Sequence, residues 1–548
     1  MRRIPFSVWC LVLLSAGLQI VIFPLPNLYW FAWIAVAPLI VAILRARVPD
    51  TLQIDGQARL LPATPWQGFV LGYVCGILWF AGTCYWIFDT MHRYGGLPIP
   101  AAALALILFC MYVGLYHGMF GLLLALVVGY KPAGSKAAGA KLAGYEASIR
   151  RALVTVPFLW VAVELARTRI TAFPWELLGY SQTGNFALTR IATLVGVYGL
   201  SFEIALVNSV FAAAFVVPRE APKGRRKWLL ASACGAALIL QTGQLLTPPP
   251  VATDHTALLV QPNIPILEGS MWTKEYFQDT LKDLTAVSLH PSGEKTDQHY
   301  DLIVWPESPA PFYTNDPLFR DAVSALALQS GTWVVSGSIG ITPVMHGGQS
   351  SQIFNSAVFV NPQGEWVGRY DKMHLVPFGE YLPFPLVFAF AGGLTKEVGE
   401  FQRGESRTPL DAGGERFGTF ICYESIFPDE VRQGPLQGAQ VLLNISNDGW
   451  YGDSGAWKQH LQQTQMRAIE NNRWLLAGAN TGKTASVDPY GRIVTTIPRK
   501  VRAALGAPYA LISGTTFYTR HGDWFAYLCA IISAAALLAH FVFAKRER

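Results

Sequence analysis

Eight apolar stretches recur along the sequence, and they restrict the possible folds more than any other feature. They lie at 6–24, 27–44, 67–88, 99–129, 152–167, 187–217, 228–246 and 524–543. A helix needs about 20 apolar residues to cross the hydrocarbon core of a bilayer. Only 14% of the residues are charged, against about 25% in ordinary soluble domains. The sequence therefore predicts a multi-span α-helical membrane domain.

Positive charges gather in every second connection between these stretches and predict the orientation of the chain. The set comprises Arg2, Arg3, Arg45, Arg47, Lys131, Lys136, Lys141, Arg150, Arg151, Arg219, Lys223, Arg225, Arg226, Lys227, Lys545, Arg546 and Arg548. Cytoplasmic loops are enriched in Lys and Arg, so we expect these connections and both termini in the cytoplasm. The net charge of +6 is concentrated there, and it gives no footprint for nucleic acid.

The sequence divides into three parts on this basis. Residues 1–246 are expected to form a transmembrane domain with about seven helices, and 521–548 a C-terminal transmembrane helix with a short cytoplasmic tail. Residues 247–520 are then expected outside the cytoplasm. Short β-branched runs alternate there with helical patterns at 274–289, 316–329, 425–438 and 457–472. This alternation predicts an α/β domain of layered sheets.

One cysteine differs from the others in its setting. Six of the seven lie inside apolar runs, where a cysteine usually behaves as a small hydrophobe. The absence of a CxxC pair and of zinc-like Cys/His spacing argues against a disulfide framework and a structural metal. Cys422 alone lies in 247–520, between an apolar run and a helical pattern, where a helix N-terminus would favour a thiolate. Taken alone, Cys422 is more simply interpreted as a buried structural residue.

Two charged residues give Cys422 a chemical context. Glu307 ends an apolar run, and Lys372 lies in a segment dense in polar and aromatic residues. Taken singly, Lys372 is more simply interpreted as a surface charge, and Glu307 fits a solvent-facing position at a strand end equally well. Together a thiol, a carboxylate and an ammonium supply the nucleophile, base and oxyanion donor that acyl transfer through a thioester requires. His374, two residues beyond Lys372, leaves a Cys/His pair open as an alternative.

Three motifs carry a resemblance to a known family. They are VWPES at 304–308, YDKMHLVPFGEY at 370–381 and ICYES at 421–425. They resemble the Glu, Lys and Cys motifs of the nitrilase, or carbon-nitrogen hydrolase, superfamily. The PFGEY form and the membrane spans narrow the resemblance to its membrane-embedded branch, the apolipoprotein N-acyltransferases. Further similar segments lie at 173–182, 196–202, 261–265, 447–453 and 488–492.

The resemblance implies a fold and a set of site residues. The fold is an α-β-β-α sandwich attached to the membrane helices. By analogy Glu307 is the general base and Cys422 the nucleophile, while Lys372 and the backbone N–H of Tyr423 stabilise the oxyanion. The auxiliary and substrate-binding positions implied by the family are Glu380, Tyr423, Glu424 and Trp272, the last on a loop where family members admit lipid.

The resemblance also implies an activity. An acyl chain moves from a membrane phospholipid to Cys422, and then to the α-amino group of an N-terminal diacylglyceryl-cysteine of an apolipoprotein. No cofactor or metal is implied. We expect a monomer in the bacterial inner membrane. A membrane-tethered amidase or nitrilase acting on a small amide stays open as an alternative, and a non-catalytic scaffold fits less well because all three catalytic residue types are present.

Two further features leave alternatives open. Lys483 stands where the family pattern predicts an apolar or small residue, and it fits either a surface position or an altered acceptor side. The connection 168–186 contains Trp175, Glu176 and Tyr180. These residues are interpreted either as part of a lipid portal or as aromatics of the membrane interface, with the second reading slightly favoured.

Overall fold

A computed structural model describes residues 4–47, 61–129, 138–216, 224–266, 271–291, 299–343, 351–382 and 401–546. The chain divides into two compact units. One comprises 1–85, 103–247 and 523–548, and the other comprises 86–102 and 248–522. Segment 86–102, which contains the connection 89–98 and the adjoining ends of the two predicted spans, thus groups with the α/β unit.

The first unit is helical, and a helix lies at each of the predicted apolar stretches. The longer helices are α1 (Phe6–Val21), α3 (Ala37–Leu44), α4 (Pro65–Thr83), α6 (Ile99–Val128), α7 (Ala138–Ala166), α8 (Ala192–Val216), α9 (Arg225–Thr242) and α17 (Trp524–Arg546). Among the described helices, three are long and apolar enough to cross a membrane: Ile99–Val128, Leu188–Val216 and Arg225–Leu245. The bent pair Pro65–Thr83 and Trp86–Tyr94 makes a fourth if it counts as one span.

The surfaces of α6 and α9 are apolar and unusually exposed. Only 22% of the most apolar window of α6 is buried, and 11% of that of α9. Exposed side chains on these helices include Leu104, Ile107, Trp228 and Ile239. A soluble protein rarely exposes so continuous an apolar surface. In a bilayer it faces lipid chains, while the helical backbone satisfies its own hydrogen bonds.

A buried asparagine forms hydrogen bonds with the backbone at a break between two short membrane helices. Helix α2 (Ala32–Ala35) stops one residue before α3, which carries a proline in its first turn. The side-chain oxygen of Asn208, from α8, accepts hydrogen bonds from the N–H groups of Val36 and Ala37 at 2.8 and 2.9 Å. Its amide nitrogen donates to the carbonyl of Ala32 at 2.8 Å. The interruption at 29–44 therefore leaves these backbone groups satisfied inside the helical unit.

The α/β unit contains two six-stranded sheets. The first has the order β12-β1-β2-β3-β4-β5 and the second β11-β10-β9-β8-β7-β6. The strands are β1 (His255–Gln261), β2 (Leu302–Val304), β3 (Trp333–Thr342), β4 (Gln352–Val360), β5 (Trp366–Asp371), β6 (Leu410–Ala412), β7 (Glu415–Ile421), β8 (Val441–Ser446), β9 (Leu475–Ala479), β10 (Ala485–Val487), β11 (Ile493–Thr496) and β12 (Ala503–Tyr509).

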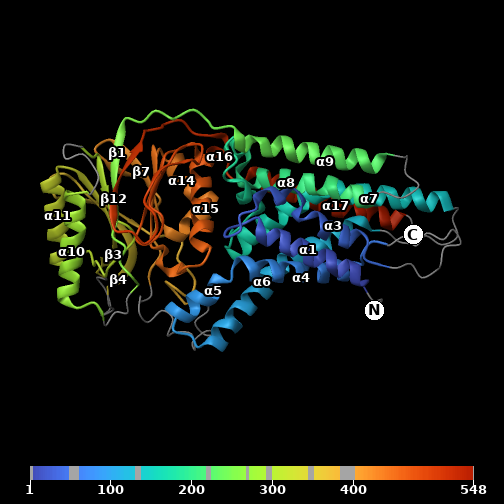
Figure 1. The fold of residues 1–548 in the computed structure, drawn as a ribbon, viewed down its shortest axis with the longest axis horizontal. Helices are drawn as coiled ribbons and strands as arrows, with labels where there is room; N and C mark the ends of the chain where they lie inside the picture. The colour runs from blue at the N-terminus through green and yellow to red at the C-terminus, as the bar shows by residue number, and fades with distance from the viewer. Residues whose placement is uncertain are drawn as a thin grey trace. The chain divides into compact units, whose positions relative to one another are not determined.

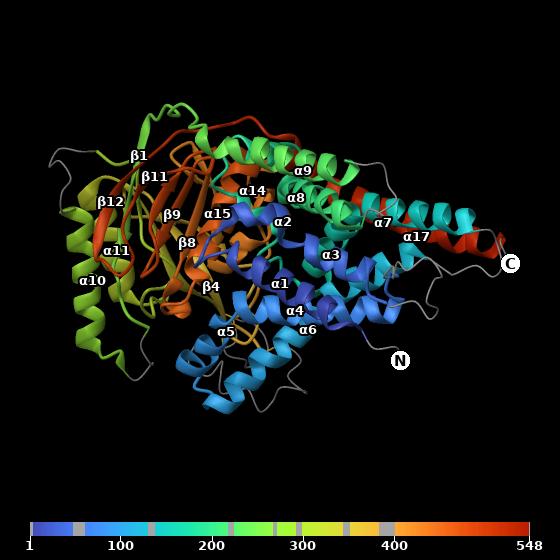
Figure 2. The same cartoon turned by 45° about the vertical axis from the view of Figure 1, so that its right-hand side comes forward.

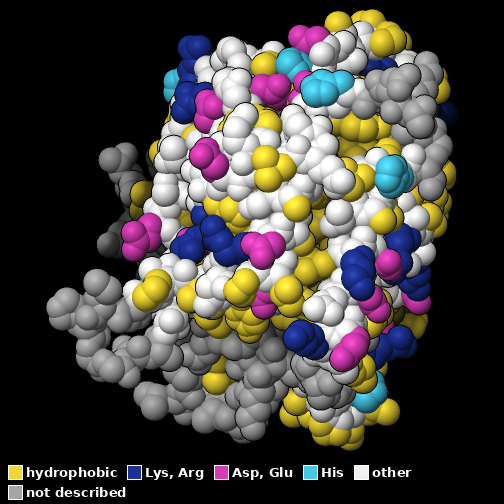
Figure 3. Space-filling view, turned by 90° about the vertical axis from the view of Figure 1, so that its left-hand side faces the viewer, with side chains coloured by type: hydrophobic (Ala, Val, Ile, Leu, Met, Phe, Trp, Pro, Cys, Tyr) yellow, Lys and Arg dark blue, Asp and Glu magenta, His cyan; other side chains and the backbone are white. Residues whose placement is uncertain are grey.

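Helices cover both outer faces of the paired sheets. Helices α10 (Lys274–Leu289) and α11 (Pro317–Ser330) lie on one side, and α14 (Gln433–Leu436) and α15 (Ala456–Asn471) on the other (Figures 1 and 2). This is the α-β-β-α sandwich that the resemblance implies. On the face seen in Figure 3, side chains of both charge signs are interspersed with apolar ones, which is typical of a solvated surface.

Strand β1 shows how the sequence builds these layers. Ala257 and Leu259 belong to the apolar cluster between the sheets, which also contains Phe359 and Phe417. The alternate residues Leu258 and Val260 belong to the cluster beneath α10 and α11. Successive side chains of a strand point to opposite faces. A strand buried on both sides therefore appears in the sequence as a continuous apolar run.

The prediction of one continuous helix at 425–438 is wrong. The structure has three short turns there: η9 (Cys422–Ile426), α13 (Pro428–Val431) and α14. Pro428 begins the second turn. Proline lacks the N–H that a continuing helix needs. Cys422 consequently begins a short 3-10 turn and not a long helix with a strong dipole.

We predict that Asp316→Ala lowers the unfolding midpoint of the purified protein, because Asp316 caps α11. Its carboxylate accepts the N–H of Phe319 at 3.1 Å. Loss of such a cap costs about 1 kcal/mol. Asp321→Ala, at an exposed position of the same helix, is the control for the change in charge. Equal shifts in the two variants, measured by thermal unfolding in detergent, would contradict the capping role.

Candidate active site

Three strand ends bring the predicted site residues together. Glu307 follows β2, Lys372 follows β5, and Cys422 follows β7. Glu307 is 6% exposed. Its Oε1 accepts hydrogen bonds from Asn355 Nδ2 at 2.8 Å and Lys372 Nζ at 3.2 Å, and its Oε2 accepts the N–H of Asn447 at 2.8 Å. The carboxylate is thus held from three directions.

Lys372 lies between two carboxylates and is 1% exposed. Its Nζ is 3.2 Å from Glu307 Oε1 and 2.9 Å from Glu380 Oε1. Burial alone would lower the pKa of Lys372, but the charges of Glu307 and Glu380 raise it above its ordinary value. The side chain therefore stays an ammonium group despite its burial.

Asn355, from the middle of β4, joins the two carboxylates. Its Nδ2 donates to Glu307 Oε1 and, at 2.6 Å, to Glu380 Oε1. Glu380 Oε2 also accepts the N–H of Val376 at 2.7 Å. Asn355 belongs to none of the motifs identified in the sequence. The available signal was an amide in a strand that is otherwise largely apolar, where a buried polar side chain needs partners.

Cys422 has an unusual backbone conformation and a neutral resting side chain. Its φ of 50° is uncommon for a residue with a side chain and often marks a functional turn. Burial and then the charge of Glu307 raise the pKa of Cys422, which Lys372 and the N–H of Asn447 partly oppose. The expectation of a resting thiolate is wrong, because desolvation outweighs the favourable contacts and no long helix begins here. Cys422 needs a base to become a nucleophile.

Glu424 fastens the turn of Cys422 to the segment that carries Lys372. It is fully buried. Its Oε1 accepts the N–H groups of Met373 and His374 at 2.9 and 3.1 Å, and its Oε2 accepts the N–H of Ile421 at 2.7 Å. The hydroxyl of Tyr370 lies within hydrogen-bond distance of both oxygens. The contacts of Glu424 make it a positioning residue.

The side chain of His374 contacts residues other than Cys422. Its Nδ1 is 2.9 Å from Glu430 Oε1, and its ring stacks on Phe427 with a centroid distance of 3.7 Å. The neighbouring ring of Tyr423 packs against Phe427 at 5.3 Å. These contacts give no support to the pairing of Cys422 with His374.

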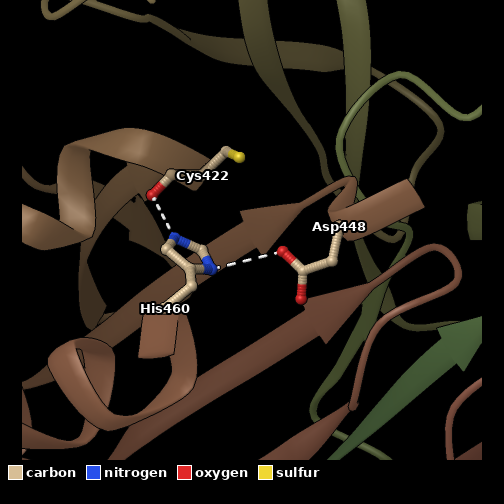
Figure 4. Close-up of side chains that lie close together, drawn as sticks. All are labelled: Cys422, Asp448 and His460. Carbon is tan, nitrogen blue, oxygen red and sulfur yellow. Dashed lines mark hydrogen bonds and ion pairs between the residues drawn. The ribbon is translucent and has the colours of Figure 1, made fainter. Parts of the chain in front are cut away.

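A different histidine lies beside Cys422. His460, from α15, contacts the main-chain carbonyl of Cys422 through Nε2 at 3.0 Å and Asp448 Oδ1 through Nδ1 at 3.2 Å (Figure 4). Burial alone would lower the pKa of His460, but Asp448 raises it above its ordinary value. The cysteine sulfur points away from the imidazole (Figure 4). The sequence analysis missed His460, because it lies in an ordinary helical pattern far from Cys422 along the chain.

Within the part of the chain that the structure describes, two groups of side chains have donor atoms close enough to hold a metal ion. Cys422, Asp448 and His460 form one group, and the other lies at the start of β1; within each, the donor atoms lie within 4.8 Å of one another. In the first group both ring nitrogens of His460 already have hydrogen-bonding or ionic partners. These contacts therefore fit a structural role, in which His460 supports the turn of Cys422 through hydrogen bonds.

The structure does not bring Trp272 into this network. Its ring lies 5.0 Å from that of Tyr276, and it packs on the apolar cluster beneath α10. Residues 267–270, which precede this segment in the predicted mobile loop, lie outside the described residues. Lys483 is half-buried between β9 and β10.

The prediction that the aromatic residues of the 168–186 connection lie at the membrane interface is wrong. Trp175, Glu176 and Tyr180 are all fully buried within the helical unit. Aromatics of a membrane interface need an amphipathic position with one wet edge. These three side chains pack in the protein interior instead.

Comparison with known proteins covers nearly the whole chain. The apolipoprotein N-acyltransferase N-terminal domain matches residues 15–210, and carbon-nitrogen hydrolase matches 259–505. An apolipoprotein N-acyltransferase of Geobacter metallireducens is 33% identical, covering 99% of this chain and 97% of the relative. One of Methylococcus capsulatus is 33% identical, covering 94% and 93%. A nitrilase-superfamily amidase of Nesterenkonia AN1 is similar to 51% of this chain and 97% of its own, with 18% identity and a TM-score of 0.36.

We predict that Gly337→Ala slows alkylation of Cys422 by iodoacetamide at neutral pH. A Cβ at this position in β3 would lie 2.2 Å from the carbonyl oxygen of Pro306 and 2.7 Å from the Cα of Glu307. The backbone at Glu307 must therefore shift, which displaces the carboxylate that we expect to deprotonate Cys422. Gly514→Ala, where a Cβ meets no atom within 4 Å, is the control. Unchanged alkylation in a folded Gly337→Ala variant would contradict this coupling.

Proposed function

The chain belongs to the apolipoprotein N-acyltransferase family, and from this premise we propose that Cys422 carries a fatty acyl group as a thioester on its way to a lipoprotein amine. The observation that carries the proposal is the contact of a buried ammonium and a buried carboxylate, Lys372 and Glu307, next to a neutral thiol. A base and a cation placed at a thiol meet the needs of covalent acyl transfer.

In the first half-reaction Glu307 takes the proton of Cys422 as the sulfur attacks an ester carbonyl of a phospholipid. The oxyanion that forms is stabilised by the ammonium of Lys372 and the backbone N–H of Tyr423. The ester C–O bond then breaks. Glu307 returns its proton to the departing alkoxide, so that a lysophospholipid leaves and the acyl chain remains on sulfur.

In the second half-reaction the α-amino group of a diacylglyceryl-cysteine attacks the thioester. Glu307 takes a proton from the attacking amine and delivers it to the departing sulfur. An amide forms, the C–S bond breaks, and Cys422 returns to its neutral thiol. Glu380 shares Lys372 and Asn355 with Glu307. We assign Glu380 to positioning Lys372, Glu424 to positioning the nucleophile turn, and Trp272 to the lipid-admitting side of the domain.

The burial of the thiol suits this chemistry. Because desolvation holds Cys422 neutral, a thiolate forms only when a substrate carbonyl is in place to receive it. A permanently charged thiolate would be exposed to oxidation and adventitious acylation. The small-amide alternative rests on a distant structural relationship alone, and we do not propose it.

We also propose a membrane arrangement for the three parts of the chain. Residues 1–246 form the transmembrane domain, 247–520 the catalytic domain on the periplasmic side of a bacterial inner membrane, and 521–548 the last helix with a cytoplasmic tail. The chain acts as a monomer. Donor and acceptor are both lipid-anchored, so a catalytic domain held at the membrane meets them by diffusion in two dimensions.

We predict that the full chain, incubated with phospholipid alone, gains the mass of one acyl chain on Cys422. Cys422→Ala should gain none, and Glu307→Gln should slow the gain by about a hundredfold or more, as expected for loss of a general base. His374→Ala should acylate normally, because its ring contacts Glu430 and Phe427. Persistent acylation of Cys422→Ala, measured by intact-protein mass spectrometry, would rule out the thioester route.

We predict that a membrane-impermeant maleimide labels Lys282→Cys in intact spheroplasts. Arg225→Cys should be labelled only after lysis. Lys282 lies on α10 with 75% of its side chain exposed, and Arg225 is exposed at the start of α9. The parent chain controls for its native cysteines, two of which are exposed. The opposite labelling pattern would overturn the orientation.

A further inference from the structure

A cluster of cations near the catalytic network has no part in the chemistry described above. We call Arg93, Arg499 and Lys500 the basic rim. Lys500 pairs with Asp453, and Arg499 Nη1 lies 4.0 Å from the same carboxylate. The hydrogen bond and charge of Lys500, followed by the charges of Arg499 and Arg93, lower the pKa of Asp453. Asp89 lies 3.6 Å from Arg93. The charge of Asp448 also acts on Arg499, but His460 pairs with Asp448 at 3.2 Å. The carboxylates that face only the three cations of the rim are therefore Asp89 and Asp453.

A short stretch of chain joins the basic rim to the nucleophile. The N–H of Asn447 donates to Glu307 Oε2 at 2.8 Å and supports the sulfur of Cys422. The turn η10 (Asp448–Tyr451) follows directly. Gly452, at its end, accepts a hydrogen bond from Arg499 Nη2 at 2.7 Å. If the ester of a substrate lies at Cys422, beside the start of η10, the basic rim lies beside the end of η10.

The backbone and side chains of the rim are held in place. Lys500 has a φ of 59°, a conformation that side-chain-bearing residues rarely adopt. Its N–H donates to Thr481 O at 3.2 Å, and its carbonyl accepts from Asn263 Nδ2 at 3.0 Å. Arg499 stacks its guanidinium over Trp457, 4.8 Å from the ring centroid.

The charges of the rim are available to a ligand. Side-chain exposure is 62% for Arg93 and 56% for Lys500. Arg499 is 14% exposed, and its buried Nε has no hydrogen-bond partner among the described residues. A buried donor without a partner is unfavourable and marks a place where a ligand acceptor would be stabilising.

We propose that the basic rim binds the phosphodiester of the phospholipid that donates the acyl chain. This inference rests on the proposed function, which makes a phospholipid the donor. Arginine and lysine are the usual partners of phosphate, and a phosphodiester would replace Asp453 as the counter-ion of Lys500. The reacting group of the acceptor is an amine, whose protonated form the rim repels. The rim therefore serves the donor and leaves the acceptor to another part of the site.

The kinetic test uses the full chain in mixed micelles with Lys500→Glu and Arg93→Glu. Each variant should raise the KM for phosphatidylglycerol in thioester formation about tenfold or more, with kcat and the KM for a lipopeptide acceptor unchanged. Lys282→Glu, the same charge change at the exposed pair with Asp279 on α10, should change neither constant. Arg93 is exposed in a short helical segment, so its variant stays informative if Lys500→Glu does not fold. A changed acceptor KM with an unchanged donor KM, or no change at all, overturns the proposal.

A binding test separates failure of this inference from failure of the thioester route. Cys422→Ala, which cannot turn over, is titrated with short-chain phosphatidylglycerol by calorimetry. Adding Lys500→Glu or Arg93→Glu to it should weaken binding about tenfold, but should leave binding of short-chain diacylglycerol, which lacks the phosphate, unchanged. Inorganic phosphate should bind more weakly than the lipid. If it binds as tightly as the lipid, the rim is a site for free anions and the lipid assignment is wrong.

Discussion

The network of buried polar side chains at the strand ends depends on one ammonium group. Lys372 holds Glu307 and Glu380 together at 3.2 and 2.9 Å in a site closed to solvent. Two buried carboxylates without this cation would repel each other, and an uncompensated buried charge costs about 3–5 kcal/mol. The cation in turn stays charged only because both carboxylates are present. The charge state of each of these three side chains therefore depends on the other two, and Asn355 ties both carboxylates to strand β4.

This dependence explains why the site lies at the ends of strands from both sheets. Glu307 and Lys372 follow strands of the first sheet, and Cys422 follows a strand of the second. Glu424 connects the two parts, because its carboxylate accepts N–H groups from Met373 and Ile421. A shift between the sheets would separate Glu307 from Cys422. The apolar cluster between the sheets, which includes Cys422 itself, resists such a shift through close packing.

Short motifs predict those parts of the site that depend on local sequence. The α-β-β-α layers followed from alternating apolar runs and helical patterns, together with the resemblance, and the three motifs contained Glu307, Lys372 and Cys422. Asn355 and His460 were missed because each acts across the fold, from β4 and from α15. The charge state of Cys422 was wrongly predicted for a related reason. Burial decides it, and burial is a property of the packed domain that no local pattern reports.

Two further buried side chains, His460 and Asp448, support the backbone at Cys422. His460 and Asp448 contribute without touching the sulfur, since they hold the carbonyl of Cys422 in its strained turn (Figure 4). Strain of this kind costs about 1–3 kcal/mol and persists only where the surroundings impose it. The contacts of His460 with the carbonyl of Cys422 and with Asp448 thus help to keep Cys422 in this conformation.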